Sequence, residues 1–283
     1  MSNRTVYAAI ILLLIVSSGC DSASPPPSSD SAENHNAAMR AATSVESAAV
    51  VTYVSGYFAS AATLAMRQTP AAEAPAQVLA AVKARVSADL VNPACVTVDT
   101  NNLTYIMITF GGCSGAHGKL GLSGTVRAEV GFETATCGQA RCPVAVLYDM
   151  TTLDLQLGNA MIIGNWQIRD PLAIDQPYTW AGLLDVVTPE RGVTFTTAAS
   201  FTRAGDCVDV TLDSTLGGSG QKSLTCSAEG LSRCMGACPN VGTVNLTTEA
   251  GAIMSWSYDG TSGADVSSES GDTFPISLTC GSS

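Results

Sequence analysis

The feature that most constrains the fold is a two-residue alternation of apolar and polar side chains, which recurs from Cys95 to the C-terminus. In residues 120–130, for example, Leu122, Val126 and Val130 alternate with polar residues such as Ser123 and Arg127. Successive side chains of a β-strand point to opposite faces, so this pattern predicts a strand with one buried face. Further strands are expected at residues 144–157, 160–168, 178–187, 193–201, 208–216, 223–228, 242–248, 252–258 and 274–280.

Short turn signals separate these segments, including Gly158-Asn159, the Gly-rich residues 217–220 and Asp259-Gly260. Short turns join antiparallel neighbours, and no helix-length pattern interrupts the series. The sequence therefore predicts a mainly β fold, an antiparallel meander that forms a barrel or a sandwich.

Two helical segments precede the strands. Apolar residues recur at three- and four-residue spacings in residues 37–67, which end near Pro70, and again from Pro75 to Leu90, before Pro93. We expect an N-terminal pair of amphipathic helices, a helical hairpin over residues 37–92, which coats one end of the sheet. Residues 47–66 are uncharged but rich in Ala, Ser and Thr, so a packed soluble helix is favoured over a membrane span.

The N-terminus has the pattern of an export signal. Arg4 is followed by the apolar residues 8–16 and then by Ser17-Ser18-Gly19-Cys20. The apolar run is too short to span a bilayer but suits a signal peptide. The stretch resembles a bacterial lipobox, although Ser17 stands where that motif prefers a Leu-like residue. The resemblance implies that Cys20 is acylated and becomes the first residue of a lipoprotein. The alternative is an ordinary cleaved signal with Cys20 in a disulfide.

The predicted organisation is therefore a signal peptide at residues 1–19, a lipidated Cys with a Ser/Pro-rich tether at 20–36, the helical hairpin at 37–92 and a disulfide-containing β domain at 93–283. Acyl chains would anchor the protein to a membrane of the bacterial envelope, facing the periplasm or the cell surface. Which membrane holds it is left open.

The charge balance excludes one class of partner. The 13 Lys and Arg fall to 12 once the signal segment with Arg4 is removed, against 24 Asp and Glu, which leaves a net charge of −12. The only lysines, Lys83, Lys119 and Lys222, are far apart in the sequence. Binding to a nucleic acid requires clustered basic residues, so it is not expected. The protein or small-molecule partner is left undefined.

Ten cysteines in an exported chain indicate disulfides. Local pairing favours Cys95–Cys113 and Cys137–Cys142. Cys207–Cys226 is plausible, and Cys280 has Cys234 or Cys238 as its candidate partner. If Cys20 carries lipid, nine cysteines remain, and one of them is a free thiol or pairs with another chain.

Residues 104–124 (TYIMITFGGCSGAHGKLGLSG) and residues 238–280, which run from Cys-Pro through a Tyr-Asp-Gly turn to a last strand, carry a resemblance. Both resemble the Cys-bearing β domains of uncharacterised Gram-negative envelope lipoproteins. The resemblance implies no activity. It implies disulfides at Cys95–Cys113 and at the Cys280 end.

No catalytic or metal-binding set stands out. Gly111-Gly112-Cys113-Ser114-Gly115 has the spacing of a nucleophile elbow with His117 nearby, but a strand follows it where a hydrolase has a helix. Cys137/Cys142 and Cys234/Cys238 are spaced like zinc ligands, yet disulfides are favoured. Three further sets were weighed and not favoured: Asp259, Asp265 and Asp272 for Ca²⁺; Asp149, Asp154, Asp170 and Asp175 as glycosidase carboxylates; and Trp166, Trp180 and Trp256 as sugar-stacking rings.

The leading hypothesis is a non-enzymatic, lipid-anchored structural or binding module without a cofactor. The alternative is a carrier that holds a hydrophobic ligand in a β-barrel cavity. A hydrolase built on Cys113 and His117 is the third possibility.

Overall fold

The computed structural model describes residues 29–58, 79–84, 92–99, 105–114, 120–137, 140–157, 159–171, 176–189, 191–205, 207–218, 221–234 and 237–278. The named elements of this part of the chain are one helix, a single 3₁₀ turn and thirteen strands, and residues 79–84 are also helical. Their bounds are α1 Ser29–Phe58, η1 Pro93–Cys95, β1 Val96–Asp99, β2 Tyr105–Ser114, β3 Leu120–Cys137, β4 Ala140–Leu157, β5 Ala160–Pro171, β6 Tyr178–Val187, β7 Gly192–Ala204, β8 Cys207–Gly218, β9 Gln221–Cys234, β10 Val241–Thr248, β11 Ile253–Ser257, β12 Gly263–Ser268 and β13 Thr273–Ser277.

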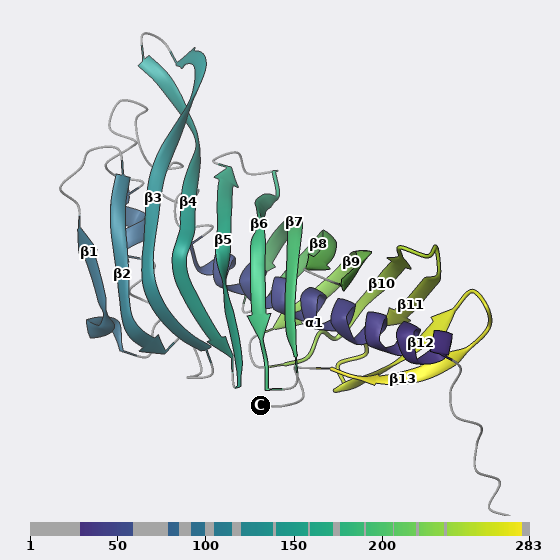
Figure 1. Ribbon diagram of the computed structural model, residues 1–283. Helices are drawn as coiled ribbons and strands as arrows, with labels where there is room; N and C mark the ends of the chain where they lie inside the picture. Colours follow the sequence, from purple (N-terminus) through teal and green to yellow (C-terminus); the bar gives the residue numbers. More distant parts are fainter. Residues whose placement is uncertain are drawn as a thin grey trace, which may run out of the picture.

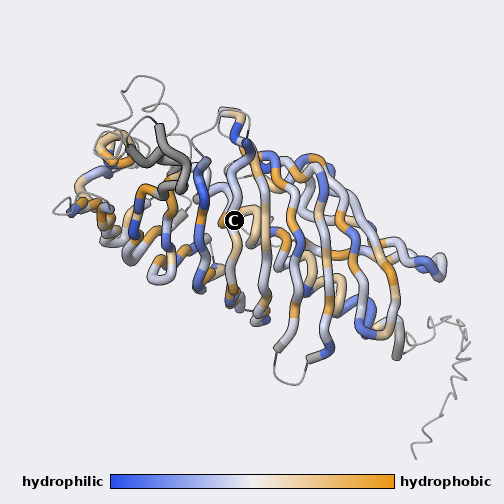
Figure 2. The backbone as a smooth tube through the Cα atoms, turned by 90° about the horizontal axis from the view of Figure 1, so that it is seen from above, coloured by the Kyte–Doolittle hydropathy of each residue, from blue (hydrophilic) through white to orange (hydrophobic). Residues whose placement is uncertain are grey.

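All thirteen strands form one antiparallel sheet in sequence order, as the predicted meander requires (Figure 1). The sheet is strongly curved but open, since no pairing joins β1 to β13 in the described part of the chain. A closed barrel is therefore not shown. Hydrophobic and hydrophilic residues alternate along the strands (Figure 2). Each strand therefore carries one apolar face, and the strand register places these buried residues on the same side of the sheet.

Helix α1 lies along the concave face of the sheet, where it contacts β6 to β10 and β13 (Figure 1). We call this the inner face. From Ala37 to Gly56 every α1 residue except Met39 is buried, on all sides of the helix. Small Ala, Ser and Thr side chains dominate this stretch, which lets the strands of the inner face approach the helix closely. The amphipathic helix expected to coat one end of the sheet is thus a helix that lies along the inner face and is buried on all sides from residue 37 to residue 56.

Two further differences concern the N-terminal region. Helix α1 begins at Ser29, within the segment predicted as tether, and not at residue 37. Residues 79–84, the described part of the second predicted helix, are helical, and Leu79 and Val82 join the hydrophobic core. The rest of that helix lies outside the described residues, so a helical pair is not confirmed. Among the described helices, none is both long and apolar enough to cross a membrane.

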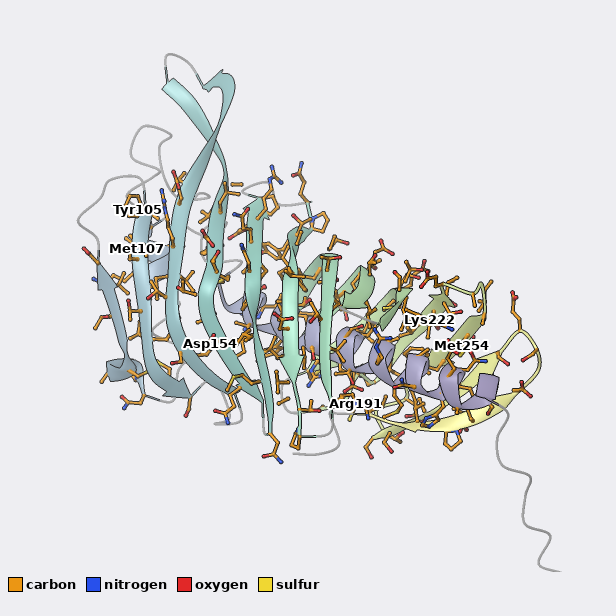
Figure 3. All side chains as sticks on the ribbon, in the orientation of Figure 1. Tyr105, Met107, Asp154, Arg191, Lys222 and Met254 are labelled. Carbon is orange, nitrogen blue, oxygen red and sulfur yellow. A yellow bond between two sulfur atoms is a disulfide. The ribbon has the colours of Figure 1, made fainter. Side chains whose placement is uncertain are left out.

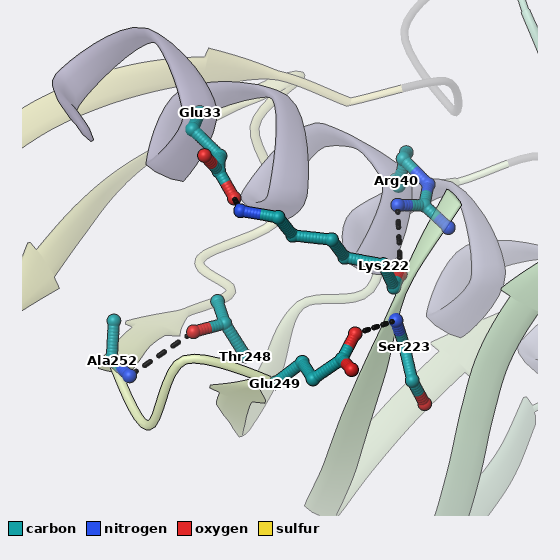
Figure 4. A network of polar contacts seen from close by, with 7 residues as sticks. All are labelled: Glu33, Arg40, Lys222, Ser223, Thr248, Glu249 and Ala252. Carbon is teal, nitrogen blue, oxygen red and sulfur yellow. Dashed lines mark hydrogen bonds and ion pairs between the residues drawn. The ribbon is translucent and has the colours of Figure 1, made fainter. Parts of the chain in front are cut away.

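Polar contacts join the N-terminal half of α1 to the start of β9, which is in turn hydrogen-bonded to the β10–β11 turn (Figure 4). Glu33 Oε1 lies 2.6 Å from Lys222 Nζ, and Arg40 Nη1 donates to the backbone oxygen of Lys222 at 3.5 Å. Glu249 accepts a hydrogen bond from the backbone nitrogen of Ser223 at 3.1 Å. The Glu33–Lys222 pair is exposed and contributes roughly 0–1 kcal/mol, so burial of the helix stabilises this packing far more.

The described cysteines confirm one predicted disulfide and correct another. Cys95 is bonded to Cys113, as expected. Cys207 is bonded to Cys234 and not to Cys226, because Cys207 and Cys234 face each other at the open ends of the β8–β9 hairpin. Cys238 is also disulfide-bonded, and Cys226 is a buried free thiol. The predicted Cys137–Cys142 pair and Cys280 lie outside the side chains that the structure describes.

Candidate functional site

An open hollow of about 560 Å³ lies on the outer face of the sheet, over β7 to β10. Eight outward side chains line it, two from each strand: Thr196, Ala198, Asp213, Thr215, Thr225, Ser227, Asn245 and Thr247. We call these residues the outer hollow. The volume is within the range of small-molecule sites, roughly 300–1,000 Å³. The outer hollow is therefore a candidate binding surface.

Strand register arranges these side chains in two rows across the strands. One row is Ala198, Asp213, Ser227 and Asn245, and the other is Thr196, Thr215, Thr225 and Thr247. Neighbouring positions within a row are about 4.8 Å apart, the spacing between strands, and the rows are about 7 Å apart, the distance covered by two residues of a strand. The result is a regular grid of short polar groups on a rigid sheet.

Most of the polar side chains in this grid have hydrogen-bonding groups available for a ligand. The side chains of Asp213, Thr215, Thr225, Asn245 and Thr247 have no hydrogen-bond partner among the described residues. Hydroxyl and amide groups both donate and accept hydrogen bonds, so they suit a ligand that carries many polar groups. Asp213 is the one charged residue in the lining, and it has no ion-pair partner in the described part of the chain.

Exposed apolar side chains mark the two ends of the threonine row. Leu183 of β6 is the cross-strand neighbour of Thr196, and Ile253 of β11 is that of Thr247. Their exposed fractions are 46% and 40%. The outer hollow therefore combines a polar floor with an apolar contact at either end.

On the inner face, behind the outer hollow, the buried polar side chains form hydrogen bonds with one another and with the backbone. Ser214 Oγ donates to Thr197 Oγ1 at 2.8 Å, and Thr197 donates to the backbone oxygen of Asp213 at 3.0 Å. Cys226 Sγ lies 3.6 Å from Ser44 Oγ of α1. Burial raises the pKa of the Cys226 thiol to about 11. A protonated, buried thiol is a poor nucleophile, so Cys226 acts as a core residue.

A second group of buried polar residues connects α1 to β9 and to the segment after β11. Glu46 and Arg233 are only 2% and 4% exposed, and Tyr258 is buried with them. Burial lowers the pKa of Arg233, while the nearby carboxylate of Glu46 opposes this shift. Burial also raises the pKa of Tyr258 well above its ordinary value, and Glu46 adds to the shift. Because these groups lie in the core, they position the helix and are not accessible to a ligand.

The predicted nucleophile elbow does not hold a free nucleophile. Cys113 lies near the end of β2, and its sulfur is bonded to Cys95. Gly115 and His117 lie outside the described residues. In this disulfide-bonded state the sulfur of Cys113 is unavailable to attack a substrate.

The predicted metal candidates are not brought together as ligands. Cys234 and Cys238 are each in a disulfide, and the side chains of Cys137 and Cys142 are not described. Asp259 and Asp272 accept hydrogen bonds from the nearby hydroxyl groups of Thr261 and Ser270, within turns of the chain. Across the described ranges, no three His, Cys, Asp or Glu residues form a group able to hold a metal ion.

The carboxylates considered for glycosidase chemistry are divided between the two faces of the sheet. Asp154 is exposed on β4 (Figure 3), and Asp149 of the same strand accepts hydrogen bonds from the backbone nitrogen and the hydroxyl group of Thr151. Asp170 of β5 is fully buried, opposite Val146 on the inner face. Asp175 lies outside the described residues. Asp170 therefore cannot share a substrate on the outer face with Asp149 or Asp154.

The three tryptophans are core residues, as the packing interpretation predicts. Trp166, Trp180 and Trp256 are each at most 2% exposed. The Nε1 of Trp180 donates a hydrogen bond of 2.8 Å to Thr52 Oγ1 of α1. No sugar can stack on these rings while the helix is in place.

Sequence reasoning did not single out the outer hollow. The signal was present in the alternation itself, because six of the eight outward residues are Thr, Ser or Asn, where Lys or Glu would be usual on a solvated face. Only the register of the four strands shows that these residues lie side by side. A comparison with protein-family models, curated proteins and solved structures found no match.

Proposed function

We propose that this chain is a lipid-anchored envelope protein that serves as a non-enzymatic binding module and presents the outer face of its sheet to a ligand. The observation that carries the proposal is the burial of α1 on all sides between residues 37 and 56. A helix that fills the concave side leaves the outer face as the accessible surface of this part of the sheet. The outer hollow lies on that face.

The same observation disfavours the carrier alternative. A hydrophobic-ligand carrier needs an apolar cavity on its inner face. Between β6 and β13 that space holds α1 side chains such as Val45, Val51 and Val54, which are fully buried. Removing such contacts costs several kcal/mol per large side chain, so a ligand would have to displace the core.

The number of cysteines supports the lipid anchor. The chain has ten cysteines, and Cys226 is a buried thiol. The other nine cannot all pair within one chain, because nine is odd. At least one more cysteine therefore lacks an intrachain disulfide. Acylation of Cys20 satisfies this requirement, since a lipidated thiol cannot form a disulfide.

The position of α1 sets how the protein would sit at the membrane. Ser29 begins the helix nine positions after Cys20. Nine residues span at most about 30 Å when extended. The N-terminal end of α1, where His35 packs against Phe274 of β13, would therefore lie close to the bilayer.

Substitution of the proposed acylation site tests the anchor. We expect Cys20→Ser to abolish metabolic labelling with a fatty acid and to move the protein from the membrane to the soluble fraction. Cys226→Ser is the matched control, because a buried thiol cannot be acylated, and it should stay labelled and membrane-bound. Unchanged membrane retention of Cys20→Ser would contradict the proposal.

A further inference from the structure

The outer hollow has a geometry that limits the shape of its ligand. Its two rows run across the strands and repeat about every 4.8 Å. This repeat is close to the advance of one sugar ring along an extended, β-linked glycan chain. Each sugar would meet one strand, with one residue of each row beneath it, so the four strands would accommodate about four sugars.

The chemistry of the lining agrees with a polyhydroxylated ligand. Thr215, Thr225, Asn245 and Thr247 offer donors and acceptors without partners among the described residues. Sugar hydroxyls require both, since each one donates and accepts. The exposed side chains of Leu183 on β6 and Ile253 on β11 lie one strand beyond the two ends of the threonine row, and they bound the polar surface with apolar groups.

Charge determines which glycan class fits. Among the described residues, Asp213 is the one charged residue that lines the outer hollow, and none of the lining residues is basic. The chain as a whole carries a net charge of −11. Uronic-acid, sulfated and phosphorylated glycans would be repelled, whereas an amino group on a sugar would pair with the carboxylate of Asp213.

We propose that the outer hollow binds an extended, amine-bearing glycan chain that crosses β7 to β10, with Asp213 pairing with a sugar ammonium group. This inference rests on the proposed function, because it requires the outer face to be the binding surface. Without an aromatic platform in the lining, affinity comes from hydrogen bonds and one ion pair. We therefore expect a dissociation constant of about 1 mM for a four-sugar chain.

The experiment is a calorimetric titration of the purified mature protein with β-1,4-linked glucosamine chains of two to six sugars. Affinity should rise with length up to four sugars and then level off, because the outer hollow spans four strands. The fully N-acetylated tetramer, which lacks the charged amine, should bind about tenfold more weakly. A tetramer of glucuronic acid should show no binding.

Substitutions in the outer hollow test whether the glycan binds there. Asp213→Asn should weaken binding of the glucosamine tetramer about tenfold and leave the N-acetylated tetramer unaffected. Thr215→Val and Thr225→Val should each weaken both tetramers several-fold. Asp209→Asn is the matched control: Asp209 is exposed on the same strand, two outward positions away, and its substitution should change nothing.

Three outcomes would overturn the inference: no tetramer binds at millimolar concentrations, Asp213→Asn has no effect on the glucosamine tetramer, or tetralysine binds as tightly as that tetramer. The last result would mean that the surface recognises positive charge, as in a cationic peptide, and not a glycan. None of these outcomes affects the anchor, because acyl labelling and fractionation of Cys20→Ser are measured independently of the sheet.

Discussion

The buried hydrogen bond between α1 and β6 gives a sharp test of the central helix. Trp180 Nε1 donates to Thr52 Oγ1 at 2.8 Å, and the hydroxyl of Thr52 in turn donates to the backbone oxygen of Ala48 at 2.8 Å. Both side chains are buried. The bond joins residues 128 positions apart in the sequence and exists only if α1 lies against the inner face of the sheet.

The expected magnitude follows from burial. Thr52→Val keeps the shape of the side chain but leaves the indole N–H without an acceptor in the core, which costs about 1–3 kcal/mol in the free energy of unfolding. Trp180→Phe removes the donor together with ring volume, so its cost is larger. In the double variant no orphaned donor remains. We therefore expect a coupling free energy of about 1 kcal/mol between the two positions.

The assay is urea unfolding of the four proteins with disulfides intact, followed by far-ultraviolet circular dichroism so that loss of a tryptophan does not alter the signal. Thr43→Val is the control, because its hydroxyl bonds only to Met39 within the helix at 3.0 Å, and it should show no coupling to Trp180→Phe. Additive effects of Thr52→Val and Trp180→Phe, within about 0.3 kcal/mol, would refute the placement of α1.

Two further substitutions test the packing of the core. Gly182→Ala should destabilise the protein by about 1–3 kcal/mol, since a Cβ there would overlap the Cβ of Trp166 on the neighbouring strand. Gly217→Ala is the control: its Cβ meets open space, so stability should change by less than about 0.5 kcal/mol. Equal melting temperatures for the two variants would contradict the register of β5 and β6. Cys226, with its pKa raised to about 11, should resist iodoacetamide at pH 8 in the native protein and react fully in guanidinium chloride. The thiol titrates at higher pH in the folded protein than in the unfolded protein, so its contribution to stability is complete below pH 9.0 and is lost as the pH rises to about 11. Cys226→Ala should therefore lose less stability over that range than the wild-type protein does. An equal loss in both proteins would count against the buried thiol.

The strands were largely predictable because their pattern is local. Leu122, Val126 and Val130 alternate in the sequence and are buried on one face in the structure. Strand β12 was missed, since Gly263 to Ser268 contains one buried apolar residue, Val266, which gives no periodicity to detect. The open sheet was also beyond prediction, because closure depends on how far the strands curve and not on their alternation.

The helix and one disulfide show where local reasoning fails. Spacing rules assume that a helix has one buried face and one exposed face, whereas α1 has no exposed residue between Val45 and Gly56. For Cys207, proximity in sequence favoured Cys226, but the hairpin register pairs Cys207 with Cys234. The Gly-rich turn at residues 217–220 does not decide between the two partners, since Cys226 is four residues nearer to the turn than Cys207 is and Cys234 is four residues farther. The outer hollow needed the register of four strands, which no single segment contains.

The most direct test of the account is the intact mass of the mature protein, alkylated in denaturant without reduction and then mapped by peptide. The account predicts a chain that begins at Cys20, carries acyl mass on that residue, has one alkyl group on Cys226 and contains four disulfides. A chain without lipid and with five disulfides would contradict both the membrane anchor and the buried free thiol.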